Sequence, residues 1–222
     1  MNSFKNVVVL SLLLGTSIVA QATPASVKFT GTATGTSANV QIPLGTQNFF
    51  LGNYNEQESG VGSFLAYCID PFQYVSSSYQ TYDKSILGLG NFSTNASARL
   101  NNVTSLFSHA YAGSVNNGVK AAGFQLALWE AFNDDMNLSS GIVKKTGSTD
   151  VTVLSEAQSL IDNLVNNSWS SSPIAYQLTA YTSQNFQDFI TVTPVPEPAS
   201  AALMLAGLGL FGFTVRRKKQ VN

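Results

Sequence analysis

The sequence has few of the residues that mark a disulfide scaffold, a metalloenzyme or a hydrolase. It has one cysteine and one histidine in 222 residues, which excludes an internal disulfide and a His/Cys metal cluster. Only 10% of the residues are charged, and neither a phosphate-binding glycine loop nor a Ser-His-Asp arrangement is visible. We therefore expect no metal, no cofactor and no enzymatic activity.

The C-terminal segment, residues 195–222, combines three features in a fixed order. A Val-Pro-Glu-Pro tetrapeptide precedes an uncharged apolar run over residues 199–215, and four basic residues follow it. As a helix this run would be roughly 25 Å long, close to the bilayer core of about 30 Å, and basic residues are typical of its cytoplasmic flank. The predicted sorting residues are Val195, Pro196, Glu197, Pro198, Arg216, Arg217, Lys218 and Lys219.

This order resembles the PEP-CTERM sorting signal of Gram-negative bacteria. The resemblance implies that a membrane-embedded exosortase recognises the tail and processes it. It also implies that the helix at 199–215 anchors the protein in the membrane during sorting, before the protein reaches the cell surface or the extracellular matrix. An ordinary membrane anchor is the alternative, but the Pro-Glu-Pro element has no role in a plain anchor.

The N-terminal segment predicts a cleaved signal peptide over residues 1–22. Lys5 supplies the positive region, residues 7–19 the apolar region, and Ala20-Gln21-Ala22 the pattern of small residues that signal peptidase cuts after. The exported body is then residues 23–194. Of 11 basic and 12 acidic residues in the chain, 6 and 11 lie in this body, so its net charge is about −5. An acidic body is a poor match for nucleic acid, and we expect no nucleic-acid partner.

Hydrophobic periodicity within the body predicts an α+β domain. Short β-branched and aromatic segments come first, three helical patterns follow, and strand character then returns. This order favours an antiparallel sheet or sandwich with an inserted helical layer over alternating βαβ units. The predicted strands are 27–30, 38–42, 49–53, 61–69, 174–181 and 186–193, and the predicted helices are 98–111, 119–132 and 152–165.

Cys68 is a lone thiol in a chain that passes through an oxidising compartment. Three interpretations are open. The side chain is a small buried hydrophobe in a core strand, it forms an intermolecular disulfide, or it is consumed in an internal cross-link.

The third interpretation draws on the helix sequence FQLALWEAF, which begins at Phe124 and contains Gln125. An aromatic residue before Cys68, Ile69-Asp70 after it, and a downstream helix with this glutamine resemble the thioester domains of bacterial surface adhesins, over residues 64–134. The resemblance implies that the Cys68 thiolate attacks the Gln125 carboxamide and expels ammonia to leave a thioester. One departure is that the family's helix often has Thr before the glutamine, where this chain has Phe124.

A thioester needs a dry wall, and Tyr67, Leu128 and Trp129 are suitable residues for it. The protein would then be a covalent adhesin that captures an amine-bearing surface or polysaccharide ligand. The alternative makes Gln125 an ordinary helix amide and Trp129 a core aromatic residue. The protein would then be a passive structural or binding component of the exopolysaccharide or biofilm matrix.

The acidic stretch Asn133-Asp134-Asp135 follows the glutamine helix. Its oxygen atoms could ligate Ca²⁺, but it lacks the spaced Asp-x-Asp-x-Asp-Gly pattern of a calcium loop. We interpret it from the sequence as a polar loop that ends the helix.

Overall fold

The fold combines one antiparallel sheet with three helices, in a computed structural model that describes residues 22–195. This confirms the predicted α+β class. The predicted signal sequence up to residue 21 and the predicted membrane helix at 199–215 lie outside the described residues. No helix within the described part is long and apolar enough to cross a membrane. The elements are β1 (Thr23–Ile42), β2 (Gly45–Glu58), β3 (Gly62–Cys68), β4 (Gln80–Ile86), a 3₁₀ turn (Leu89–Asn91), α1 (Ala96–Ser114), α2 (Gly118–Asn133), β5 (Lys144–Lys145), α3 (Val151–Asn166), β6 (Tyr176–Thr182) and β7 (Phe189–Pro194).

The strand pairings close on themselves. The start of β1 pairs with β4, and the rest of β1 pairs with β2. From β2 the pairing continues through β3, β7 and β6 back to β4, and every pair is antiparallel. The strands therefore form one strongly curved sheet rather than a sandwich of two. At the bend of the β1–β2 ribbon, Gly52 has φ +149°, and a Cβ atom there would collide with the Thr34 carbonyl oxygen.

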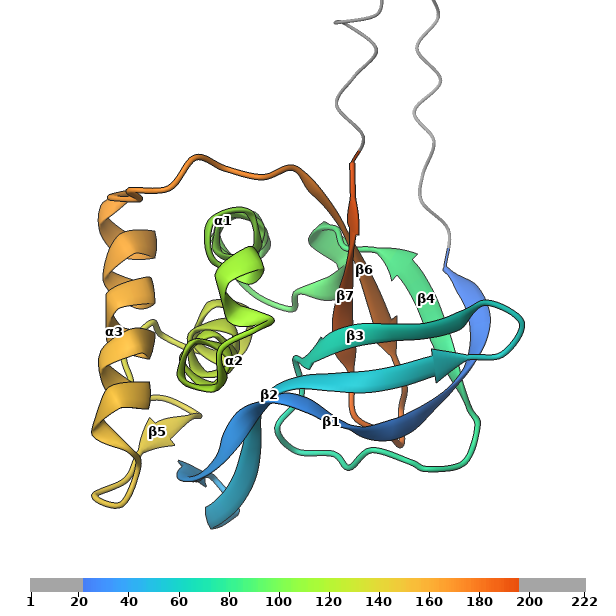
Figure 1. Cartoon of the computed structure of the whole chain (residues 1–222), viewed down its shortest axis with the longest axis horizontal. Coiled ribbons are helices and arrows are strands. Elements are labelled where there is room, and N and C mark those ends of the chain that lie inside the picture. The colour runs from blue at the N-terminus through green and yellow to red at the C-terminus, as the bar shows by residue number, and fades with distance from the viewer. Residues whose placement is uncertain (1–21, 196–222) are drawn as a thin grey trace, which may run out of the picture.

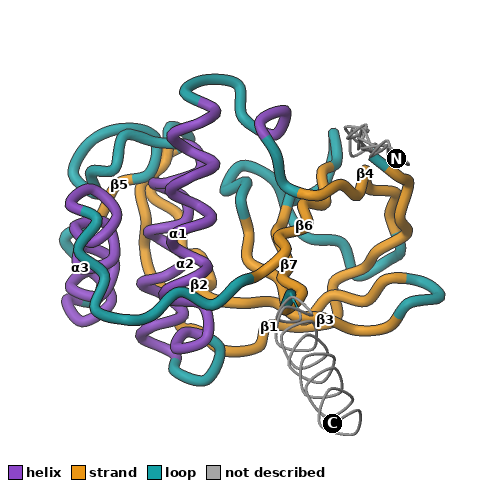
Figure 2. Tube along the Cα trace, turned by 90° about the horizontal axis from the view of Figure 1, so that it is seen from above, coloured by secondary structure: helices purple, strands orange, loops and turns teal. Residues whose placement is uncertain are grey.

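The helices form a separate layer beside the sheet (Figures 1 and 2). They are inserted between β4 and β6, and α2 packs against α1, α3 and the β1–β2 ribbon. Residues 121–131 of α2 are all buried, so this helix is the centre of the main core. A smaller core lies within the sheet, built from Ala25, Val27, Ala66, Tyr82, Tyr181 and Phe189.

Several elements differ from the sequence-based predictions. The segments 27–30 and 38–42 belong to one long strand, β1, because the small polar residues between them continue the ladder with β2. The strand β4 was not predicted, since Tyr82 is its one buried residue. The predicted helix at 152–165 is confirmed as α3, and its N-cap is Asp150, whose carboxylate accepts from the Thr152 and Val153 N–H groups at 2.7 and 3.3 Å.

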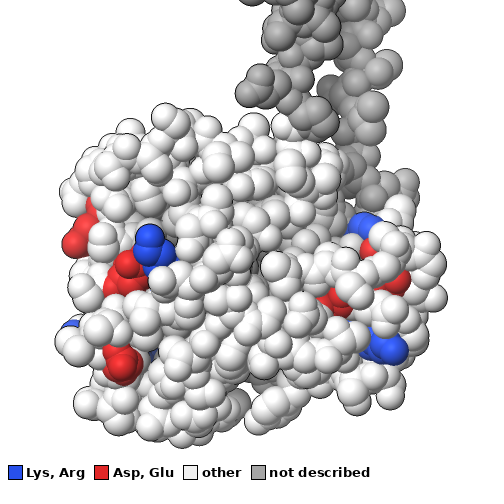
Figure 3. Space-filling view, viewed as in Figure 1, with Lys and Arg blue, Asp and Glu red and all other residues white. Residues whose placement is uncertain are grey.

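Charged residues are sparse on the surface. On the face drawn in Figure 3, acidic and basic side chains gather in small groups near the edges, and the middle is uncharged. Among the described residues, one ion pair is shorter than 4.0 Å, and it joins Lys84 to Glu58 at 2.8 Å.

Candidate thioester site

The fold brings Cys68 and Gln125 together from a strand and a helix. Cys68 is the last residue of β3, opposite Phe189 of β7, and Gln125 is near the middle of α2. Both are 0% exposed. The Ile69 N–H donates to the Asp188 carbonyl oxygen at 2.9 Å. Because successive backbone groups point to opposite sides of a strand, the N–H and C=O of Cys68 point away from β7.

Two hydrogen bonds join the Gln125 side chain to the backbone of Cys68. The Cys68 N–H donates to Gln125 Oε1 at 3.2 Å, and Gln125 Nε2 donates to the Cys68 carbonyl oxygen at 2.7 Å. The amide thus occupies the position of a neighbouring strand beyond the end of the β2–β3 ladder. A buried amide without partners would cost several kcal/mol, roughly 2–7, so these bonds hold Gln125 in this place.

The thiol of Cys68 is shielded from solvent and protonated at neutral pH. Its Sγ donates to the Asp70 carbonyl oxygen at 3.1 Å. Burial raises the pKa of the thiol well above its usual range, the nearby carboxylates of Asp70 and Asp188 raise it further, and Trp129 beside the sulfur opposes them. A thiol in this environment is not reactive towards solutes in water.

The three residues predicted to form a wall occupy different positions. Trp129 is buried beside the thiol, packs edge-on against Phe49 at 5.4 Å, and its Nε1 has no hydrogen-bond partner among the described residues. Leu128 is buried in the main core. The ring of Tyr67 lies 4.5 Å from the ring of Phe124, so it packs into the helical layer.

Polar partners that the sequence did not predict support this region. The Tyr67 hydroxyl donates to Ser114 Oγ at 2.8 Å and accepts from Asn53 Nδ2 at 3.2 Å. Asn133, at the end of α2, donates to the Ile69 carbonyl oxygen at 2.6 Å. These residues tie α1 and α2 to the end of β3, and no local sequence pattern marks them.

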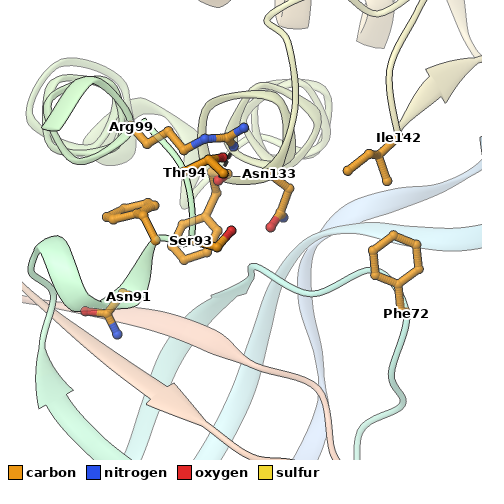
Figure 4. Close-up of a pocket in the computed structure, with 9 residues that line it drawn as sticks. Phe72, Asn91, Ser93, Thr94, Arg99, Asn133 and Ile142 are labelled. Atoms are coloured by element: carbon orange, nitrogen blue, oxygen red, sulfur yellow. Dashed lines mark hydrogen bonds between the residues drawn. The ribbon is translucent and has the colours of Figure 1, made fainter. Parts of the chain in front are cut away.

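A cavity of about 180 Å³ lies next to the segment that follows Cys68 (Figure 4). Phe72 and Ile142 line one side of it and Asn91 and Ser93 the other, with Arg99 nearby. Asn133 lines this cavity and also donates to the carbonyl oxygen of Ile69, the residue that follows Cys68.

Comparisons with known proteins give one family match and several structural neighbours. Residues 194–218 match the PEP-CTERM protein-sorting motif, which confirms the predicted sorting signal and marks an exported, surface-associated protein. A search of curated proteins found no match.

The structural neighbours include N-terminal thioester domains of surface proteins. The N-terminal thioester domain of fibronectin-binding protein SfbI from Streptococcus pyogenes is 15% identical with a TM-score of 0.44, and the match covers 65% of this chain and 86% of that one. The N-terminal domain of the Streptococcus pyogenes pilus tip adhesin Cpa is 17% identical, with a TM-score of 0.44 and coverage of 65% and 84%. The N-terminal thioester domain of a Clostridium perfringens surface protein is 13% identical, with a TM-score of 0.45 and coverage of 64% and 89%.

Proposed function

We propose that the exported body is a covalent adhesin that carries an internal thioester between Cys68 and Gln125. The observation that carries the proposal is the pair of hydrogen bonds between the Gln125 amide and the Cys68 backbone. They hold the carboxamide against the one residue of the chain that has a thiol. Complete burial of both residues supplies the water exclusion that a thioester needs.

In the proposed bond-forming step, Sγ of Cys68 attacks the amide carbon of Gln125. The C–N bond breaks, and the amide nitrogen leaves as ammonia with the thiol proton. The Cys68 N–H, which donates to Gln125 Oε1, is placed to stabilise the negative charge that develops on this oxygen.

The ligand in this proposal is a primary amine on a surface protein or polysaccharide. The amine attacks the thioester carbonyl, an amide bond to Gln125 forms, and Cys68 returns as a free thiol. Each molecule reacts once, so the protein is a single-use acylating agent and not an enzyme.

The sorting motif implies that an exosortase processes the C-terminal tail. We propose that the protein is membrane-anchored through residues 199–215 during sorting and then resides at the cell surface or in the extracellular matrix. The mature protein should therefore lack residues 216–222. Mass spectrometry of surface-exposed protein tests this, and recovery of the intact basic terminus would contradict it.

The decisive experiment for the thioester is the intact mass of the exported protein. Closure removes one ammonia, so the mass should be about 17 Da below that of the unmodified chain, and methylamine should then add about 31 Da at Gln125. An unmodified mass with no methylamine adduct would overturn the proposal.

A passive component of the extracellular matrix is the second candidate. The observation in its favour is that the same two hydrogen bonds satisfy the unpaired backbone at the end of β3. Gln125 therefore has a structural role even where no thioester forms, and an unmodified mass would favour this candidate.

A further inference from the structure

Three carboxylates meet where α2 ends. Glu130 lies in the last turn of α2, Asp134 is its C-cap, and Asp135 follows. An oxygen of each lies within 4.8 Å of an oxygen of the other two. The three residues line a cavity of about 230 Å³, together with Asn102 and other residues of α1.

Backbone donors hold these carboxylates in place. Glu130 Oε2 accepts from the Asn137 N–H at 2.9 Å, and Asp135 accepts from the same N–H at 3.1 Å and from Ser140 Oγ at 2.8 Å. Asp134 Oδ2 accepts from the N–H groups of residues 142 and 143, both at 2.6 Å. The loop therefore folds around the cluster.

Glu130 has an oxygen that lacks a partner. Its side chain is 1% exposed, and Oε1 is buried without a hydrogen bond among the described residues. A buried carboxylate oxygen normally has a hydrogen-bond donor or a metal ion beside it, because burying an unpaired charge is costly. Glu130 thus indicates a missing positive partner in the cavity that it lines.

The one basic residue that lines this cavity, Arg99, does not supply the partner. Its guanidinium donates to the carbonyl oxygens of Phe132 and Asp134, the latter at 3.1 Å (Figure 4 shows Arg99). None of the three carboxylates has a cationic side chain within 4.0 Å in the described part of the chain.

We propose that Glu130, Asp134 and Asp135 form a binding site for Ca²⁺. Carboxylate oxygens are the ligands that Ca²⁺ prefers, and oxygens that all lie within 4.8 Å of one another can contact one ion at about 2.4 Å. Mg²⁺ at about 2.1 Å demands a smaller, octahedral set of ligands. The negative end of the α2 dipole also favours a cation here, and the exported location exposes the site to extracellular Ca²⁺.

The site is distinct from Cys68 but lies on the same helix as Gln125. Glu130 directly follows Trp129, and Asn133, in the same turn, binds the Ile69 carbonyl oxygen beside Cys68. A bound ion would stabilise the end of α2 and hence the position of Gln125. The proposal does not depend on thioester formation, because ion binding is measured without any reaction at Cys68.

The test uses the full chain, freed of metal with a chelator and titrated with CaCl₂. We expect one Ca²⁺ ion to bind per chain. The thermal unfolding midpoint should rise as CaCl₂ is increased to about 5 mM. Glu130→Gln and Asp135→Asn should each weaken binding by at least about 10-fold, because changing even an outer partner of a metal ligand typically costs about that much. The matched control Asp83→Asn changes an exposed acid on β4 and should bind as the wild type does.

Hydrogen exchange on the wild-type chain gives a second measurement that needs no variant. Ca²⁺ should slow exchange at the amides of Asn137, Ile142 and Val143, which hold the carboxylates. No binding by about 5 mM, unchanged exchange at these amides, or binding in both variants as tight as in the wild type would overturn the proposal. Tighter binding of Mg²⁺ than of Ca²⁺ would overturn the assignment of the ion.

Discussion

Gln125 of α2 and Cys68 of β3 exchange two hydrogen bonds, at 3.2 and 2.7 Å, between a side-chain amide and a strand backbone. Both ends of the amide are engaged, so the side chain is confined to one orientation. These two hydrogen bonds join the helical layer to the sheet just beyond Tyr67, the last residue of β3 that pairs with β2.

The Gln125→Ala variant should leave Cys68 with a free thiol, because no thioester can form without the glutamine amide. Wild-type protein with a thioester offers no titratable thiol after denaturation, whereas Gln125→Ala should offer one per chain. Cys68→Ala should abolish methylamine incorporation, and Gln158→Ala, at an exposed glutamine of α3, should behave as the wild type. A titratable thiol in denatured wild-type protein, together with no methylamine adduct, contradicts the thioester.

Gln125→Ala should also destabilise the fold. In the Cys68→Ala background, where no thioester forms and the amide stays intact, it removes two hydrogen bonds and leaves the backbone of residue 68 unsatisfied and a cavity in the core. We expect a loss of about 2–4 kcal/mol in the free energy of unfolding, measured by denaturant titration. A loss below about 0.5 kcal/mol would mean that water or another side chain replaces the amide.

The Tyr67 hydroxyl should contribute to stability through its two partners. Tyr67→Phe leaves Asn53 and Ser114 without this contact in a buried environment. We expect the free energy of unfolding to fall by about 1–3 kcal/mol. Tyr74→Phe is the matched control, because Tyr74 is 77% exposed, and it should have no measurable effect.

Gly123 allows α2 and α3 to approach closely. A Cβ atom there would lie 2.6 Å from Glu156 Cγ and 3.0 Å from the Ala157 backbone nitrogen. Alanine favours helices by about 1 kcal/mol over glycine, but we expect Gly123→Ala to destabilise by about 1–3 kcal/mol because the helices must separate. Gly113→Ala in α1, where the nearest atom is 3.9 Å away, should instead be neutral or stabilising in the same thermal unfolding assay.

Glu56 should make stability fall as the pH rises. This side chain is 4% exposed, and burial raises its pKa from 4.5 to about 8 in the folded state. The folded protein therefore holds a proton that the unfolded chain has lost, and the associated stability is complete below pH 4.5 and lost as the pH approaches 8.

Glu56→Gln removes this titration. The free energy of unfolding of Glu56→Gln, relative to that of the wild type, should increase from pH 4.5 to about pH 8 by on the order of 3 kcal/mol. Urea unfolding at a series of pH values measures this difference. Asp83→Asn should show no such pH-dependent difference. Parallel pH profiles for the wild type and Glu56→Gln would refute the expected role of Glu56.

The helices of this fold can be predicted from sequence, and part of the sheet cannot. Amphipathic spacing gives all three helices to within three residues at each end. Strand β4 shows no alternating apolar pattern in the sequence, because Tyr82 is its one buried residue. The closed order of the strands depends on pairings between distant segments, such as β3 with β7, which no local pattern encodes.

For the candidate sites too, the sequence indicates some residues but not the contacts between them. The family resemblance points to Cys68 and Gln125, but not to the hydrogen bonds that join them. The acidic stretch at residues 133–135 contains two of the three carboxylates of the cluster, but a spaced calcium-loop pattern does not include Glu130. The available signal was helical, since Glu130 and Asp134 are four residues apart and so lie one turn apart along α2.

The pairing of β7 with β3 also sets how the domain would bear mechanical force. β7 ends at Pro194, where the sorting motif begins, and it pairs with β3 along the stretch that ends at Cys68. In an anchored adhesin, tension would enter at β7 and leave through the ligand on Gln125. Residues 125–194 lie between these two points, and a bond from Gln125 to Cys68 closes no loop within that segment, so in the proposed adhesin the segment could extend under load while the amide bond to the ligand persists. The protein would then act as an extensible tether.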